Sequence, residues 1–213
     1  MIIDERMSAF INSFASPNSE KLDKLEQYSI ETNVPIIRRE MQSLIKFLLV
    51  AVKPHSILEV GTAIGFSGLL MAENTGNDTS ITTIEKYEKR IPIAKENFKN
   101  FGYEDRITLL EGDAAEILKN LEGPYDFIFM DAAKGQYINF LPEVLRLLSK
   151  GGILLSDNCL QDGDILESKF AVERRNRTIY LRMRDYLYEL THNGELTTVI
   201  LPVGDGVTIS TKK

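Results

Sequence analysis

The chain is poor in soft metal ligands and has no tryptophan: its 213 residues include one cysteine and two histidines. A lone cysteine, Cys159, cannot form a disulfide within the chain, which agrees with a reducing compartment. It also excludes a zinc site built from cysteines. We therefore expect any bound metal to be a hard cation such as Mg²⁺, held by carboxylate and amide oxygens. His55 and His192 are expected to be structural or exposed.

Long apolar stretches and an export signal are also missing. The longest unbroken apolar run, residues 47–52, has six residues, whereas a membrane-spanning helix needs about 20. The opening residues, Met-Ile-Ile-Asp-Glu-Arg, become acidic early and contain no apolar core of a signal peptide. The sequence thus predicts a cytoplasmic protein with no membrane segment.

Positive charge is in deficit, since the formal net charge is −6. This argues against general affinity for nucleic acids, because binding phosphates needs a surplus of Lys and Arg. The arginines are unevenly spread, however, and five of the eleven lie between Arg174 and Arg184. A local anion-binding segment therefore stays possible.

No repeat, low-complexity tract or linker divides the sequence, so we predict a single domain over residues 1–213. Residues 1–53 are expected to form a helical cap, with helices at 4–14, 20–33 and from Pro35 to 52. Residues 54–213 are expected to form an α/β core. In this core, short apolar runs alternate with helix-length segments such as 87–101 and 141–148. The expected strands are 56–60, 80–84, 107–110, 127–130 and 153–156.

The carboxyl end has the pattern of a hairpin, with strands at 197–203 and 207–211 joined by Gly204-Asp205-Gly206. Together these elements predict a doubly wound, mostly parallel seven-stranded sheet with an antiparallel terminal hairpin. A ligand of such a sheet is expected at the carboxyl ends of the parallel strands.

The first expected strand enters a glycine-containing turn, Gly61-Thr-Ala-Ile-Gly65, followed by a helix. The spacing is not that of the dinucleotide fingerprint, and the motif is also compatible with a tight turn alone. The second strand ends in Glu85, where a carboxylate can accept hydrogen bonds from both hydroxyls of a ribose. The alternative for Glu85 is a solvated helix cap.

Polar residues follow the remaining strands as well. Glu111-Gly112-Asp113-Ala114 offers a carboxylate and an amide suited to an adenine edge. Asp131 follows the fourth strand, and Asp157 with Asn158 follows the fifth, so two carboxylates and an amide meet at adjacent strand ends. Three such oxygens suit Mg²⁺. The alternative for each is a loop-capping role.

These motifs resemble, in the same order, those of the magnesium-dependent O-methyltransferases that include the catechol and caffeoyl-coenzyme A enzymes. The resemblance covers most of the chain and implies a Rossmann-like class I methyltransferase fold, with S-adenosylmethionine across the first three strand ends. It implies that Asp131, Asp157 and Asn158 hold Mg²⁺, and that Lys134 with Asp131 is catalytic, Lys134 lying beside the acceptor hydroxyl. The alternative for Lys134 is a surface loop lysine. The cofactor-binding residues implied are Met41, Glu59, Gly61, Ser67, Glu85, Asp113, Ala114 and Asp131.

The segment 171–179 and the ending Leu201-Pro-Val-Gly-Asp-Gly-Val look like the bacterial branch that methylates 5-hydroxyuridine in the tRNA anticodon to 5-methoxyuridine. On this reading Arg174, Arg175 and Arg177 hold tRNA, beside a helix whose apolar face is Ile179, Met183, Tyr186 or Leu187, and Leu190. Tyr137 and Phe170 are candidates for stacking on bases. The alternative is that the arginines form a solvated face paired with acidic neighbours.

Chemistry alone supports two acceptors. A Mg²⁺ ion held by few protein ligands can chelate two adjacent substrate oxygens and lower the pKa of a hydroxyl. Catechol has two such hydroxyls, and 5-hydroxyuridine has its hydroxyl beside a carbonyl. The first hypothesis is a tRNA 5-hydroxyuridine methyltransferase, the second a catechol-type small-molecule methyltransferase, whose acceptor ring calls for an apolar clamp. The third is a non-catalytic binding module. Following the family, the chain is expected to form a homodimer.

Overall fold

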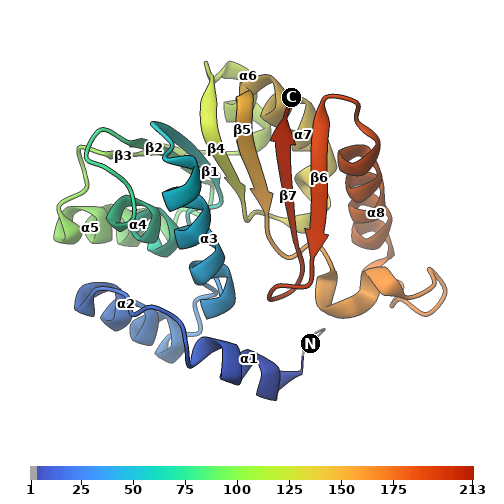
Figure 1. Ribbon diagram of the computed structural model, residues 1–213, viewed down its shortest axis with the longest axis horizontal. Coiled ribbons are helices and arrows are strands. Elements are labelled where there is room, and N and C mark those ends of the chain that lie inside the picture. Colours follow the sequence, from blue (N-terminus) through green and yellow to red (C-terminus); the bar gives the residue numbers. More distant parts are fainter. Residues whose placement is uncertain (1–3) are drawn as a thin grey trace.

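The computed structural model describes residues 4–213, apart from the side chain of Asp162. A seven-stranded sheet in the order β3-β2-β1-β4-β5-β7-β6 forms its centre (Figure 1). β1 to β5 run parallel, whereas β7 pairs antiparallel with both β5 and β6. This confirms the predicted mostly parallel sheet with its terminal hairpin. The strands are β1 Ser56–Val60, β2 Ser80–Glu85, β3 Ile107–Glu111, β4 Tyr125–Met130, β5 Leu148–Ser156, β6 Leu196–Leu201 and β7 Val207–Lys212.

Helices cover both faces of the sheet, because side chains of a strand alternate between its two faces. Ile57 and Phe127 belong to the apolar cluster under α2 to α5, whereas Leu58 and Ile128 belong to the cluster under α6 to α8. Leu22 of α2 and Met41 of α3 are buried in the first cluster. The α-helices are α1 Glu5–Asn12, α2 Glu20–Glu31, α3 Arg39–Val52, α4 Phe66–Glu73, α5 Ile91–Phe101, α6 Ala114–Asn120, α7 Tyr137–Leu147 and α8 Arg177–His192, and the 3₁₀ helices are η1 Lys134–Gln136 and η2 Gln161–Leu166.

Two helices begin later than predicted. α3 starts at Arg39 rather than at Pro35, and the extended residues before it carry Ile37, whose carbonyl accepts a hydrogen bond from Gln42 at 3.2 Å. α5 starts at Ile91 rather than at residue 87, because the backbone amides of Lys86 and Tyr87 donate to the Glu85 carboxylate at 3.0 and 2.8 Å. In both places side-chain to backbone bonds hold an irregular segment next to the strand ends.

The region between α7 and β5 also differs from the prediction. Leu148 is not the last residue of a helix but the first residue of β5. Gly151-Gly152, expected to stop the helix, lies inside this strand, where the register against β4 shifts and Gly151 adopts a φ of +76°. A glycine pair in a strand permits such an irregularity. At the other end of the sheet, β6 ends at Leu201, two residues before the predicted end.

The register of the parallel strands aligns their carboxyl ends. Val60 pairs with Ile84 and Met130, and Met130 pairs with Ser156. The residue after each of these strand ends therefore emerges at one edge of the sheet. That edge carries the functional candidates.

Candidate active site

A cavity of about 800 Å³ lies at the carboxyl edge of the parallel strands. It is large enough for more than one small molecule, given that ligand pockets range from about 300 to 1,000 Å³. Most of the predicted site residues lie along its wall. These are Met41, Gly61, Ser67, Glu85, Asp113, Ala114, Asp131, Asp157 and Asn158.

The glycine turn and Glu85 form one side of the cavity. The amides of Gly61 and Thr62 donate to the Ile84 carbonyl at 3.1 and 3.2 Å. Gly61 has a φ of +112°, and a Cβ there would collide with the Asp131 carbonyl oxygen, so the close approach of β1 and β4 requires glycine. One Glu85 oxygen accepts from the Ala63 amide at 2.7 Å. The amides around it therefore fix the direction of this carboxylate.

Asp113 and Ala114 form the outer rim of the same side. Asp113 caps α6 by accepting from the Ala115 amide at 2.9 Å, and this hydrogen bond lowers the pKa of its carboxyl group. The Lys86 ammonium lies 3.4 Å from the second Asp113 oxygen. Asp113 thus serves as the N-cap of α6 and also lines the cavity.

Glu59 is the predicted cofactor residue that the structure places outside the wall. Strand alternation directs it to the face covered by α4, where it is fully buried. The Ser67 hydroxyl donates to one of its oxygens, and the Thr83 hydroxyl donates to the other. Burial is the main cause that raises the pKa of Glu59 to about 7. Glu59 therefore supports Ser67 from beneath the cavity.

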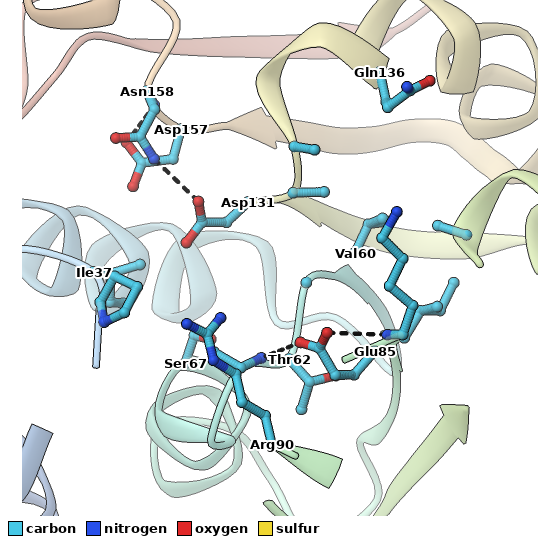
Figure 2. Close-up of a pocket in the computed structure, with 18 of the residues that line it drawn as sticks. Ile37, Val60, Thr62, Ser67, Glu85, Arg90, Asp131, Gln136, Asp157 and Asn158 are labelled. Carbon is cyan, nitrogen blue, oxygen red and sulfur yellow. Dashed lines mark hydrogen bonds between the residues drawn. The ribbon is translucent and has the colours of Figure 1, made fainter. Parts of the chain in front are cut away.

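Asp131, Asp157 and Asn158 meet on the opposite side of the cavity (Figure 2). The Asn158 side-chain amide donates to Asp131 Oδ1 at 3.0 Å, and the Asn158 backbone amide donates to Asp157 Oδ1 at 2.6 Å. Asn158 adopts a φ of +59°, a left-handed conformation that Asn tolerates. Three polar side chains from two neighbouring strand ends thus form one cluster.

The electrostatics of this cluster fit a divalent cation. Burial raises the pKa of Asp157 to about 7, with the charge of Asp131 as the second cause. Burial also raises the pKa of Asp131. Two buried carboxylates that repel each other, beside an amide oxygen that can rotate inward, are a donor set for a hard cation. Among residues 4–213, no three or more His, Cys, Asp or Glu side chains are grouped so that they could hold a metal ion, so a site here would need Asn158 as well as the two carboxylates.

Lys134 lies next to the cluster but not on the cavity wall. Its ammonium forms an ion pair with Asp205 Oδ2 at 2.9 Å, and Asp205 does line the cavity. The sequence placed Asp205 in a turn and in the ending that resembles one branch of the family, but gave it no role in the site. Arg38, for which anion binding or a solvated face was expected, lines the cavity, and so does Arg90, which the sequence did not single out. The signal for Asp205 was its place in a hairpin turn that returns to the carboxyl edge.

Comparison with known proteins identifies the family. A family model described as O-methyltransferase matches residues 12–213. This chain belongs to the O-methyltransferase family. It is 31% identical over 173 residues to a caffeoyl-CoA O-methyltransferase of Stellaria longipes, covering 78% of this chain and 71% of that protein.

Solved structures agree with the O-methyltransferase fold. A crystal structure of a Staphylococcus aureus protein assigned to the caffeoyl-CoA O-methyltransferases superposes with a TM-score of 0.90 at 33% identity, covering 99% of this chain and 100% of that one. A methyltransferase of Podospora anserina with SAH bound superposes with a TM-score of 0.88 at 30% identity, covering 98% and 94%. These likenesses confirm the predicted methyltransferase fold.

The arginine segment of this O-methyltransferase lies outside the cavity wall. Arg174 and Arg175 precede α8 and are exposed, and Arg175 pairs with Glu173 at 2.7 Å. Arg177 donates to the Val172 carbonyl at 3.1 Å. Arg182 and Arg184 likewise donate to the carbonyls of Gly135 and Ile165 at 3.1 and 3.3 Å. Three of the five arginines therefore donate hydrogen bonds to backbone carbonyls within the chain.

The predicted apolar face of α8 and the stacking candidates need correction. Tyr180, not Ile179, is buried on α8 together with Met183, Tyr186 and Leu190. Tyr137 is fully buried, with its hydroxyl 3.0 Å from the Met130 carbonyl oxygen, so it cannot stack on a base. Phe170 is exposed as that role requires.

The remaining minor predictions concern Cys159, the histidines and membrane insertion. Cys159 is fully buried, as expected of a packing residue, and burial raises the pKa of its thiol to about 12. His55 and His192 are exposed. Within residues 4–213, no helix has the length and apolar character needed to cross a membrane.

Proposed function

We propose that this chain transfers a methyl group from S-adenosylmethionine to a hydroxyl of a small acceptor with two adjacent oxygens, with the aid of a divalent cation. The single observation that carries this proposal is the shared cavity. The Asp131, Asp157 and Asn158 cluster faces the same space as the Gly61 turn and Glu85. The SAH in the related Podospora anserina structure supports the cofactor.

The cofactor would lie along the Gly61 turn, with Glu85 toward its ribose. Because the Ala63, Lys86 and Tyr87 amides already orient Glu85, its remaining lone pairs are available to hydroxyl donors. Ser67, held by Glu59, would face the amino-acid end. When bound, the cofactor would supply a methyl group on a sulfonium; the acceptor oxygen would attack this methyl carbon in line, and the sulfur would leave as a thioether with the carbon–sulfur electron pair.

The cation would be held by Asp131, Asp157 and Asn158. When bound, it supplies positive charge that lowers the pKa of an acceptor hydroxyl and chelates the oxygen next to it. The chain itself orients the two reactants, and such positioning is a large part of catalysis in two-substrate reactions. The Lys134 ammonium, held by Asp205, would stabilise the ionised acceptor oxygen by its positive charge.

A caffeoyl group carries two adjacent phenolic hydroxyls, so the name of the Stellaria longipes relative favours a catechol-type acceptor. Phe66, Phe140, Met41 and Ile37 offer apolar contacts along the cavity wall. These side chains would serve as the clamp for a planar ring, which the chain builds without tryptophan.

The test is a methyl-transfer assay with labelled S-adenosylmethionine, with catechol as acceptor, in Mg²⁺ or in excess EDTA. We expect methylation that requires the cation, and we expect Asp131→Ala to reduce it at least about 10³-fold, since it removes a ligand at the reacting centre. Asp78→Ala, which removes an exposed carboxylate paired with His55, is the matched control. Full activity in EDTA, or in Asp131→Ala, would contradict the proposal.

A second candidate acceptor is 5-hydroxyuridine in tRNA. One observation favours it: the segment that carries Arg174 and Arg175 lies at the same edge of the sheet as the turn between β6 and β7 (Figure 1), and both arginines are exposed. Exposed guanidinium groups beside an active site are suited to phosphates.

Replacing Arg174 and Arg175 together with alanine separates the two acceptors. If tRNA is the substrate, the double variant should raise KM for hydroxyuridine-containing tRNA about tenfold or more, because two phosphate contacts are lost. The KM for the cofactor should not change. Lys24→Ala with Lys119→Ala, at exposed lysines of α2 and α6, is the charge-matched control. Equal tRNA kinetics in all three proteins would exclude this role for the arginines.

A further inference from the structure

Asp205 is a buried carboxylate to which the family resemblance assigned no role. It lies in the turn between β6 and β7 and is 3% exposed. Its Oδ2 accepts from the Lys134 ammonium at 2.9 Å. Burying a carboxylate costs free energy, because the charge loses its hydration. The ion pair with the partly exposed Lys134, which is distant in sequence, offsets part of that cost.

The turn that carries Asp205 is fastened to the loop of the metal candidates. The amide of Cys159 donates to the Gly206 carbonyl at 2.8 Å, and the amide of Leu160 donates to the Asp205 carbonyl at 2.9 Å. These two residues directly follow Asn158. Gly206 has a φ of +80°, and a Cβ there would collide with the Leu160 side chain, so the contact tolerates little displacement. Asp205 therefore has a fixed place relative to the cluster.

Lys134 is within electrostatic reach of that cluster. Asp205, which holds its ammonium, lines the same cavity as Asp131, Asp157 and Asn158. The Lys134 stem is long and flexible, and η1 begins three residues after Asp131. We expect an ammonium released from Asp205 to turn toward the carboxylates of Asp131 and Asp157. There it would compete with a divalent cation for the same oxygens.

We propose that Asp205 is a positioning residue that holds the Lys134 ammonium beside the Asp131, Asp157 and Asn158 cluster instead of on it. The cluster then stays open to a divalent cation, while the ammonium stays bound to Asp205, which lines the same cavity. This inference rests on the proposed function, because it assumes that the cluster binds the cation. It makes the terminal hairpin part of the active site.

The test is a double-mutant cycle of Mg²⁺ affinity, measured by calorimetry with S-adenosylhomocysteine present. Asp205→Asn should weaken Mg²⁺ binding about tenfold, because the freed ammonium neutralises the carboxylates. Lys134→Met should bind Mg²⁺ at least as tightly as the unmodified protein. In the combined variant the affinity should return to that of Lys134→Met, because the competing ammonium is gone.

Activity gives a second measure. Asp205→Asn should lower kcat and leave KM for the cofactor unchanged. If Asp205→Asn does not fold, as judged by circular dichroism, the smaller Asp205→Ser is measured with the same expectations.

Three results would overturn the inference. Equal weakening by Asp205→Asn with and without Lys134 would mean that Asp205 acts by its own charge. Unchanged affinity in Asp205→Asn would mean that it does not act on the cation at all. An unmodified protein that binds no Mg²⁺ would overturn the proposed function as well, so the two failures are distinguishable.

Discussion

Burial decides what the carboxylates around this cavity do. Glu85 is ringed by backbone amides and lies on the wall, whereas Glu59 is enclosed and bonded to two hydroxyls. Burial raises the pKa of Glu59 to about 7, and the negative charges of Asp131 and Glu85 add to the same direction. The same residue type therefore serves as a half-buried acceptor on the cavity wall at one position and as a buried support at another.

Glu59 gives a pH prediction. Its pKa in the folded protein, about 7, is higher than the ordinary value of 4.5, so folding favours the protonated form. The stabilisation is present below pH 4.5 and is lost as the pH rises through about 7. Glu59→Gln removes this dependence, and its free energy of unfolding relative to the unmodified protein should therefore rise between pH 5 and pH 8, by on the order of 1–3 kcal/mol. Urea denaturation at a series of pH values measures it.

The comparison for this experiment is Glu26→Gln. Glu26 is also buried but is paired with Arg39 at 2.7 Å, so losing its charge leaves a guanidinium without its partner. Glu26→Gln should destabilise the protein at pH 8. A Glu59→Gln curve parallel to that of the unmodified protein at every pH would contradict the assignment of the raised pKa.

At the scale of elements, the turn between β6 and β7 lies at the carboxyl edge of the sheet and contributes Gly204 and Asp205 to the cavity wall. Gly206 allows the turn to approach Leu160, and the amides of Cys159 and Leu160 donate to the turn. The irregular segments before α3 and α5 have a similar position at the cavity. These three connections, more than the regular helices and strands, shape the space above the strand ends.

Gly102 and Gly206 have similar left-handed backbone angles but different surroundings. Replacing each with alanine therefore distinguishes the cost of backbone strain from the cost of a steric clash. Gly206 has a φ of +80° and its Cβ would collide with Leu160, whereas Gly102 has a φ of +75° and nothing within 4 Å of its Cβ. Gly102→Ala should cost about 1–2 kcal/mol through the left-handed backbone alone. Gly206→Ala should cost about 1–3 kcal/mol more, because Leu160 must move. Equal urea midpoints for the two variants would show that the turn accommodates the extra methyl group.

At the scale of the whole molecule, most helices bury apolar side chains against the sheet, whereas α1 leaves its apolar side chains exposed. Two clusters fill the two faces of the sheet, and α2 and α3 join one of them. This agrees with a helical cap packed on the α/β core, although residues 1–3 of the predicted single domain lie outside the described residues. By contrast, α1 has no buried residue. The apolar side chains exposed on and beside α1 and on α3 are Met7, Phe10, Ile11, Phe14, Phe47 and Val50.

We propose that a second copy of the chain covers this surface. This would form the homodimer that the family resemblance leads us to expect. Light scattering coupled to size exclusion should then give twice the 24.1 kDa of one chain. Phe10→Asp with Phe14→Asp should shift the mass toward 24.1 kDa, because a charge at an apolar contact is costly to bury. Tyr87→Asp, at an exposed aromatic residue beside the cavity rim, is the control. A single-chain mass for the unmodified protein would exclude the dimer.

Much of the site was accessible from the sequence because it follows from local rules. Short apolar runs located the strands, and parallel strands bring their carboxyl ends to one edge. Asp131, Asp157 and Asn158 were therefore predicted to be neighbours, and the structure brings them together. Lys134 was predicted near them, but its partner Asp205 was not, because 71 residues separate the pair.

The sequence by itself determined which residues stand at the strand ends, since the hydrophobic period and the turn residues depend only on near neighbours in the chain. The tertiary structure decided what those residues contact. It turned Glu59 toward α4, assigned Arg177, Arg182 and Arg184 to backbone carbonyls, and joined Asp205 to Lys134. Such partners depend on how distant elements pack, and packing is a property of the whole chain.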